Sequence, residues 1–130
     1  MREAIAVPLI GWSRAFPATP EQIREARQFL TGILDGHPVA DDAVLCLSEL
    51  ATNAILHSRS REPGGHFLVR AERHGHRVRV EVSDQGGPWE PSATDDDQNG
   101  RGLLVVAQLA SNFGRTGDDQ AGWTLWFECG

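Results

Sequence analysis

Apolar residues recur at helical spacing in two stretches of the first half of the chain. The first opens at Thr19, which can cap a helix, followed by Pro20, which suits the first helical position, and Gln22, which completes a capping box. Its apolar stripe continues to residue 34, just before a Gly and a Pro. A second helical pattern runs from about Ala40 to His57, starting at two acidic residues whose charges suit a helix N-terminus.

Strict alternation of apolar and polar residues predicts strands in the second half. Two strands are expected over residues 67–71 and 78–82, joined by a tight turn at residues 74–76. Residues 113–116 and 123–127 form a similar pair near the end of the chain. These four segments provide the sheet of the expected fold.

Three further segments complete the expected order. Residues 5–10 are apolar and contain Pro8, as an edge strand or an irregular lead-in does. Residues 85–101 show no periodicity, which predicts a functional lid, and residues 102–111 predict a third helix. We therefore expect one domain over residues 1–130: an α/β fold, a two-layer sandwich with a mixed, mostly antiparallel sheet and helices on one face.

Composition narrows the classes of partner. The 130 residues carry a net charge of -6, which argues against direct binding of nucleic acid. All 12 basic residues are Arg, so any phosphate must be met by Arg, backbone amides or a metal ion. Cys46 and Cys129 lack metal-ligand spacing, which predicts free thiols. The chain shows neither a membrane-length apolar run nor a signal peptide, so we expect a cytoplasmic protein with no membrane partner.

The second predicted helix carries the most informative polar residues. On a helical wheel Glu49, Asn53 and His57 fall on one line, and apolar residues surround that line. A buried Glu and a buried Asn need partners, because leaving them unpaired is costly. One interpretation places Glu49 and Asn53 at a rim, bonded to a loop or to Arg. The other is a metal and phosphate site, in which Asn53 supplies a neutral oxygen ligand and Glu49 orients or deprotonates a nucleophile.

The strand over residues 78–82 ends in Asp84 followed by glycines. An Asp at a strand end can accept a hydrogen bond from an exocyclic amine such as that of adenine, and Gly86 lets the backbone approach the ring. The alternative is a plain Asp-Gly turn that closes the strand.

Glycines also stand at the start of the third predicted helix. Gly100, Arg101, Gly102 and Leu103 offer free amide groups, a positive charge and a helix N-terminus, all of which favour an anion. A simple transition from loop to helix explains the same residues. Thr124 places a hydroxyl on the last strand, where an ordinary strand threonine is the alternative.

The order and spacing of these signals resemble the GHKL ATPase superfamily, which has the Bergerat ATP-binding fold. Within it the chain is most similar to the small anti-sigma-factor serine kinases, because residues 48–57, Ser-Glu-Leu-Ala-Thr-Asn-Ala-Ile-Leu-His, closely resemble their N box. The resemblance covers the chain from its first strand to its last. It rests on Glu49-x-x-x-Asn53, Asp84-x-Gly86, Gly100-x-Gly102 and Thr124.

The resemblance implies ATP and Mg²⁺ as ligands and a role for each site residue. Asn53 would be a ligand of Mg²⁺, and Glu49 would be the general base toward the acceptor hydroxyl. Asp84 would bond the adenine amine, Gly86 would line the ring, and Thr124 would assist through water.

The lid residues have implied roles as well. The phosphates would be cradled by Gly100, Arg101, Gly102 and Leu103. His57 matches a His often seen at the end of this helix, where both packing and contact with the nucleotide are open. The first glycine box of the family usually reads Asp-x-Gly-x-Gly, but Pro88 stands at the second glycine and Gly87 is displaced by one. This departure concerns the hinge of the lid more than the adenine contact.

The resemblance implies a protein serine kinase that passes the γ-phosphate of ATP to a serine of an antagonist protein and sequesters a sigma factor. A second copy of the chain is a further candidate partner. The alternative is a non-catalytic module that uses nucleotide to shape a docking surface for a regulator. A sensor histidine kinase fragment is disfavoured because no phospho-acceptor helix pair precedes the domain, and an ATP-hydrolysing clamp because the chain has no Lys.

Overall fold

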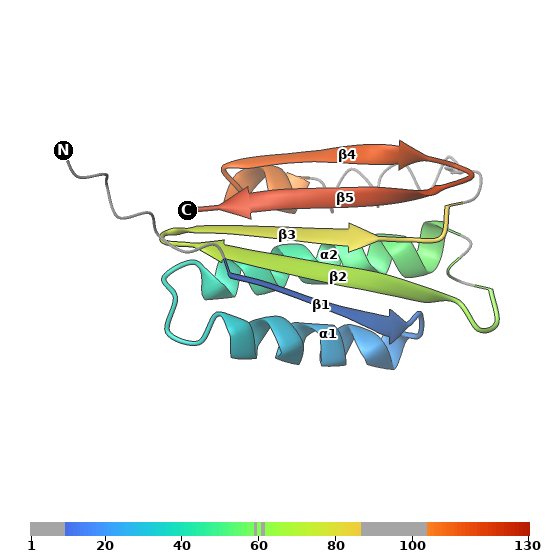
Figure 1. Cartoon of the computed structure of the whole chain (residues 1–130), viewed down its shortest axis with the longest axis horizontal. Helices are drawn as coiled ribbons and strands as arrows, with labels where there is room; N and C mark the ends of the chain where they lie inside the picture. Colours follow the sequence, from blue (N-terminus) through green and yellow to red (C-terminus); the bar gives the residue numbers. More distant parts are fainter. Residues whose placement is uncertain (1–9, 59, 61, 87–103) are drawn as a thin grey trace.

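The computed structural model describes residues 10–58, 60, 62–86 and 104–130 (Figure 1). Its strands form a five-stranded sheet in the order β1-β2-β3-β5-β4. The elements are β1 (Ile10–Pro17), α1 (Pro20–Ile33), α2 (Ala40–His57), β2 (His66–His74), β3 (Arg77–Ser83), β4 (Asn112–Asp118) and β5 (Gly122–Cys129). Residues 104–109 are also helical, within the range expected for a third helix.

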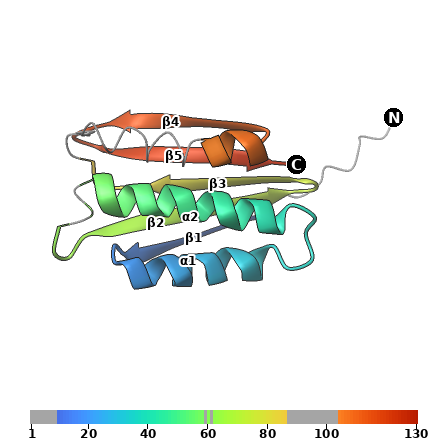
Figure 2. The ribbon, with the colours of Figure 1, turned by 180° about the vertical axis from the view of Figure 1, so that it is seen from behind.

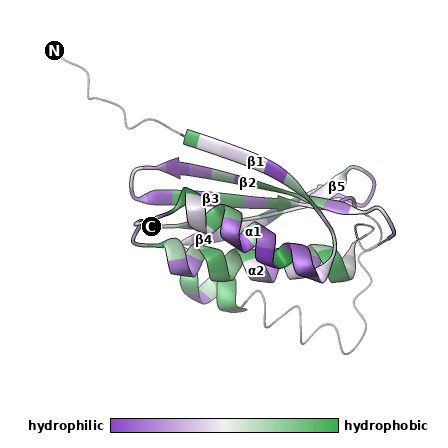
Figure 3. Ribbon diagram, turned by 90° about the horizontal axis from the view of Figure 1, so that it is seen from below, coloured by the Kyte–Doolittle hydropathy of each residue, from purple (hydrophilic) through white to green (hydrophobic). Residues whose placement is uncertain are grey.

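The sheet and helices form the two layers that the sequence predicts. The views from behind and from below show α1 and α2 on one face of the sheet, while its other face is open (Figures 2 and 3). The α/β fold class is confirmed. Within it, all four strand pairings are antiparallel, so the sheet of the described strands is not mixed. The reason is that β5 folds back as a hairpin and inserts between β3 and β4.

Helix α1 begins at Pro20, as predicted, and it packs against α2 and β1. The predicted capping box is wrong, because the Thr19 side chain makes no cap hydrogen bond. The Gln22 N–H instead donates to the main-chain oxygen of Thr19, at 2.9 Å. Backbone bonding alone therefore starts this helix.

Helix α2 runs from Ala40 to His57, as the apolar pattern predicts, and it packs on β3 and β5. Its inner face is buried because apolar residues recur at helical spacing. Neither described helix is long and apolar enough to cross a membrane. The core between α2 and the sheet includes Ala43, Leu47, Leu50, Ala51, Ala54, Val78, Val80, Val82, Leu125 and Phe127.

The sequence predicts an edge strand or an irregular lead-in at residues 5–10, of which the structure describes residue 10. The strand instead occupies Ile10–Pro17 and pairs with β2 along its whole length. Only Phe16 is fully buried in it, stacked on Phe67 with ring centroids 5.5 Å apart. Because β1 has only one buried apolar residue, its sequence shows almost no alternation of apolar and polar positions.

Truncating the buried face of α2 should destabilise the fold. Leu47→Ala should lower the free energy of unfolding by about 3 kcal/mol, because Leu47 is fully buried and its loss leaves a cavity. Leu45→Ala, on the same helix but 47% exposed, should cost less than about 1 kcal/mol. Urea unfolding followed by circular dichroism measures both. Equal effects would contradict the assignment of the two helix faces.

Candidate nucleotide-binding site

The end of α2, the end of β3 and the turn between β4 and β5 lie at the same end of the molecule (Figure 1). Glu49 and Asn53 lie one turn apart in the second half of α2, the half that ends in this region. Asn53 is only 7% exposed, and its side chain makes no hydrogen bond to another described residue. Glu49, one turn earlier on the same helix, is half-buried.

Asp84 follows β3 directly, and one of its carboxylate oxygens is fixed by two main-chain bonds. Oδ1 accepts the N–H of Gly86 at 2.7 Å and that of Trp123 at 3.0 Å. The Asp84 N–H in turn donates to the main-chain oxygen of Trp123, at 2.9 Å. Oδ2 has no partner among the described residues. Through Oδ1, Asp84 therefore closes the turn after β3 and joins it to the start of β5.

Glycine is required on both sides of the contact between Asp84 and the β4–β5 turn. Gly86 has φ +77°, and a Cβ there would overlap the main-chain oxygen of Asp119. Gly122 has φ +107°, and a Cβ there would overlap the main-chain oxygen of Asp84. The turn and the segment 84–86 thus pack backbone against backbone, which only glycine permits.

Two buried serines connect the end of α2 to the same segment. The Ser58 hydroxyl donates to the Ala54 carbonyl at 2.6 Å, and the Ser60 N–H donates to Ser58 Oγ at 3.0 Å. The Gln85 N–H then donates to Ser60 Oγ, at 3.0 Å. Sequence reasoning did not find these serines. The sequence feature that could have revealed them is the presence of Ser just after a helix end, where its hydroxyl bonds readily to nearby backbone groups.

The structure does not bring Thr124 to this site. In β5 the buried Leu125 and Phe127 face the helices, so Thr124 faces the open side of the sheet. Its hydroxyl lies 2.8 Å from that of Ser83, its direct neighbour across the strands. Neighbouring residues of a strand point to opposite faces of the sheet, so Trp123, one position before Thr124, lies on the helix side.

Other predicted site residues lie outside the described part of the chain. The lid expected over residues 85–101 is described only at Gln85 and Gly86. The side chain of His57 is also outside the description. The same holds for Gly87, Pro88, Gly100, Arg101, Gly102 and Leu103.

Cys46 and Cys129 are free thiols, as predicted, and they are buried against each other in the core. The hydrogen bond from Cys46 to Cys129, followed by burial, raises the pKa of the Cys46 thiol, while the same bond lowers the pKa of Cys129. Cys46 is fully buried, so its thiol is inaccessible from solvent. Within the described residues, no cluster of three His, Cys, Asp or Glu could hold a metal ion.

Comparison with known families identifies this arrangement. Residues 16–128 match the model of the histidine kinase-like ATPase domain. The chain belongs to that family. Membership in a family of ATPase domains implies that the chain binds ATP.

Three serine-protein kinases of bacilli are similar to this chain. The serine-protein kinase RsbW of Bacillus velezensis is 32% identical over 111 residues, covering 72% of this chain and 69% of that protein. RsbW of Bacillus licheniformis is 31% identical and that of Bacillus subtilis 28% identical, with the same coverage. The chain is therefore a distant relative of serine-protein kinases.

The hydrogen bonds that join α2 to Gln85 through Ser58 and Ser60 should contribute measurably to the free energy of unfolding. Ser60→Ala should lower the free energy of unfolding by about 1–3 kcal/mol, because the Gln85 N–H loses its partner. Ser13→Ala, at an exposed position of β1, should change it by less than about 0.5 kcal/mol. Denaturant unfolding gives the energies, and hydrogen exchange at the Gln85 amide should speed up only in Ser60→Ala. Unchanged exchange there would show that the link does not hold this segment.

Proposed function

We propose that this chain is an ATP-dependent protein serine kinase. ATP would bind between α2 and residues 84–86, and its γ-phosphate would pass to a serine of an antagonist protein. The observation that carries the proposal is the Asp84 carboxylate, with Oδ1 fixed by two main-chain amides and Oδ2 unpartnered among the described residues. The relation to serine-protein kinases supports the choice of reaction.

Asp84 would select the base. Its Oδ2 would accept a hydrogen bond from the exocyclic amine of adenine, and such a bond to a charged group contributes roughly 1.5–3 kcal/mol. A base with an oxo group in place of this amine would bring its oxygen against Asp84 Oδ2, and two hydrogen-bond acceptors would face each other. Gly86 keeps the wall beside Asp84 free of a side chain.

Asn53 would hold Mg²⁺ through its amide oxygen, with water and phosphate oxygens as the other ligands. Its burial, and a side chain with no hydrogen-bond partner within the part of the chain that the structure describes, fit that role. When bound, the ion would neutralise charge on the phosphates. The chain has no Lys that could do the same, so the protein's own contribution would come from Arg and from backbone amides.

Glu49 would take the proton of the acceptor serine. As the serine oxygen forms its bond to the γ-phosphorus, the hydroxyl proton passes to the Glu49 carboxylate. The bond from the γ-phosphorus to the bridging oxygen breaks, and ADP leaves with the electron pair. Positioning by α2 would supply most of the catalysis, since Glu49 and Asn53 share one helix face.

The proposed partners are a sigma factor and an antagonist protein that opposes this chain as an anti-sigma factor, in the cytoplasm. These follow from the resemblance of residues 48–57 to the N box of anti-sigma-factor kinases. The net charge of -6 supports protein partners over nucleic acid. A pair of identical chains is compatible with the open face of the sheet.

Replacing Glu49 should separate transfer from binding. Glu49→Gln should reduce phosphate transfer by about a hundredfold or more, because the general base is lost. Its affinity for ATP should stay close to that of the wild type. The matched control is Asp42→Asn, an exposed carboxylate on the same helix, which should transfer normally. The assay uses γ-labelled ATP, Mg²⁺ and candidate antagonist proteins, with phosphoserine as the readout.

Two results of this assay would count against the proposal. Transfer by Glu49→Gln at the wild-type rate would show that Glu49 is not the base. Wild-type protein that binds ATP but labels none of the antagonist proteins would favour the non-catalytic binding module instead.

A further inference from the structure

Trp123 is bonded to Asp84 through both of its main-chain polar groups. Its N–H donates to Asp84 Oδ1 at 3.0 Å, and its carbonyl accepts the Asp84 N–H at 2.9 Å. It is the first residue of β5 on the helix side, one position before Thr124. The main chain at this residue therefore sets the direction of the Asp84 carboxylate.

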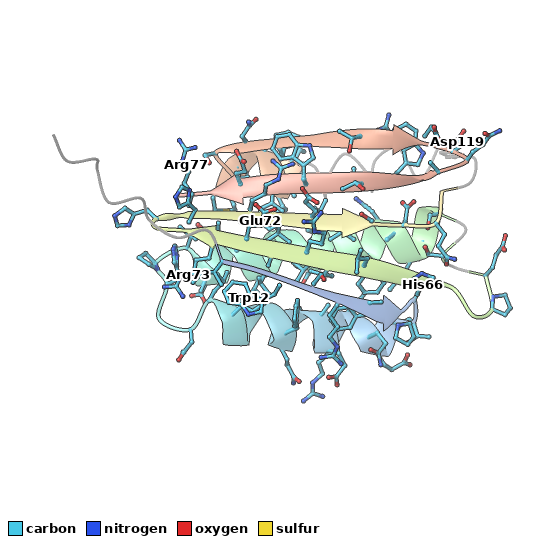
Figure 4. The ribbon with its side chains drawn as sticks, viewed as in Figure 1. Trp12, His66, Glu72, Arg73, Arg77 and Asp119 are labelled. Carbon is cyan, nitrogen blue, oxygen red and sulfur yellow. The ribbon has the colours of Figure 1, made fainter. Side chains whose placement is uncertain are left out.

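The side chain of Trp123 is held on the hairpin that joins β4 and β5. Its indole Nε1–H donates to Asp119 Oδ1 at 2.9 Å. The Arg115 guanidinium carbon lies 4.3 Å from the centre of the ring. Figure 4 labels Asp119 at the turn of this hairpin. Two partners from the same hairpin thus fix an indole that is only half-buried.

The turn that carries Asp119 is itself rigid and rests on the Asp84 segment. Asp118 Oδ1 accepts the N–H of Gln120 at 2.9 Å and the N–H of Ala121 at 2.5 Å. The main-chain oxygen of Asp119 lies against Gly86, where no side chain would fit. A change at the indole therefore reaches Asp84 through two routes, the Trp123 main chain and the contact with Gly86.

We propose that Trp123 is a positioning residue for base recognition. Its indole, held by Asp119 and Arg115, fixes the main chain that bonds Asp84 Oδ1 and so aims Oδ2 at the exocyclic amine of the base. This inference rests on the proposed ATP site. Trp123 itself does not touch the reacting phosphate, so its loss should change which base is bound rather than the rate of transfer.

The chain supplies a matched control on the same strand. Trp126 also lies in β5 and also has an Arg over its ring, with the Arg79 guanidinium carbon 4.2 Å from the centre. It faces the open side of the sheet, where it covers Gly114 rather than the Asp84 segment. Trp126→Ala therefore removes a comparable packing contact without reaching the proposed site.

The experiment compares ATP with inosine triphosphate, which has an oxo group in place of the amine. Calorimetry gives the affinity of each for wild type, Trp123→Ala and Trp126→Ala. Wild type should prefer ATP. Trp123→Ala should weaken ATP binding by about tenfold, the effect of one hydrogen bond to a charged group, and leave inosine triphosphate nearly unchanged. Trp126→Ala should keep the wild-type preference.

A preference for ATP that survives in Trp123→Ala would overturn this inference and leave the proposed function intact. Equal weakening of both nucleotides would also overturn it, because that is the signature of a merely structural role. If the wild type binds neither nucleotide, that result would contradict the proposed function and also this inference, which rests on it. If Trp123→Ala does not fold, Trp123→Phe keeps a smaller aromatic ring beside Arg115 and removes the indole N–H that bonds Asp119, and the same loss of preference is expected.

Discussion

The carboxylate of Asp84 connects the end of β3, the start of β5 and the candidate site through hydrogen bonds. Its Oδ1 holds the N–H of Gly86 just after β3 and the N–H of Trp123 in β5. The pairing of β3 with β5 is thus extended beyond the sheet into the loop. Because Oδ1 is held by two main-chain amides, the proposed bond to the base would fall to Oδ2, whose direction is set before a ligand binds. Such preorganisation lowers the cost of binding.

The phosphate side of the site depends on the same segment. Ser58 and Ser60 join the last turn of α2 to Gln85, next to Asp84. The helix that presents Glu49 and Asn53 is therefore tied by hydrogen bonds to the segment that would hold the base. This explains why small, fully buried serines follow the helix, where a longer side chain would separate the two elements.

Sequence patterns predict most of the fold because its elements have strong periodicity. Helix α2 has the predicted bounds, and the hairpin of β2 and β3 turns at Gly75, whose φ of +63° suits the predicted tight turn. Strand β1 could not be predicted in the same way, because an edge strand with a single buried anchor, Phe16, has almost no alternation. The capping box failed because a motif permits a side-chain bond without requiring it.

The site is harder to predict than the fold, since it depends on contacts between distant segments. Asp84 is predicted as a site residue from its position at a strand end, but its two main-chain partners follow only from the folded contact with the start of β5. Thr124 and Trp123 are neighbours in sequence, and only the register of β5 decides which of them faces the helices. A resemblance names residue types in order, whereas the face that each one occupies is a property of the folded sheet.

The central claim is that this chain binds ATP at the end of α2, with Asn53 as the ligand of Mg²⁺. The most direct measurement is calorimetric titration of wild type and Asn53→Ala with ATP, in the presence and absence of Mg²⁺. The account predicts that wild type binds ATP more tightly with Mg²⁺ and that Asn53→Ala loses this gain. Absence of ATP binding by the wild type, or an equal gain from Mg²⁺ in both proteins, would contradict it.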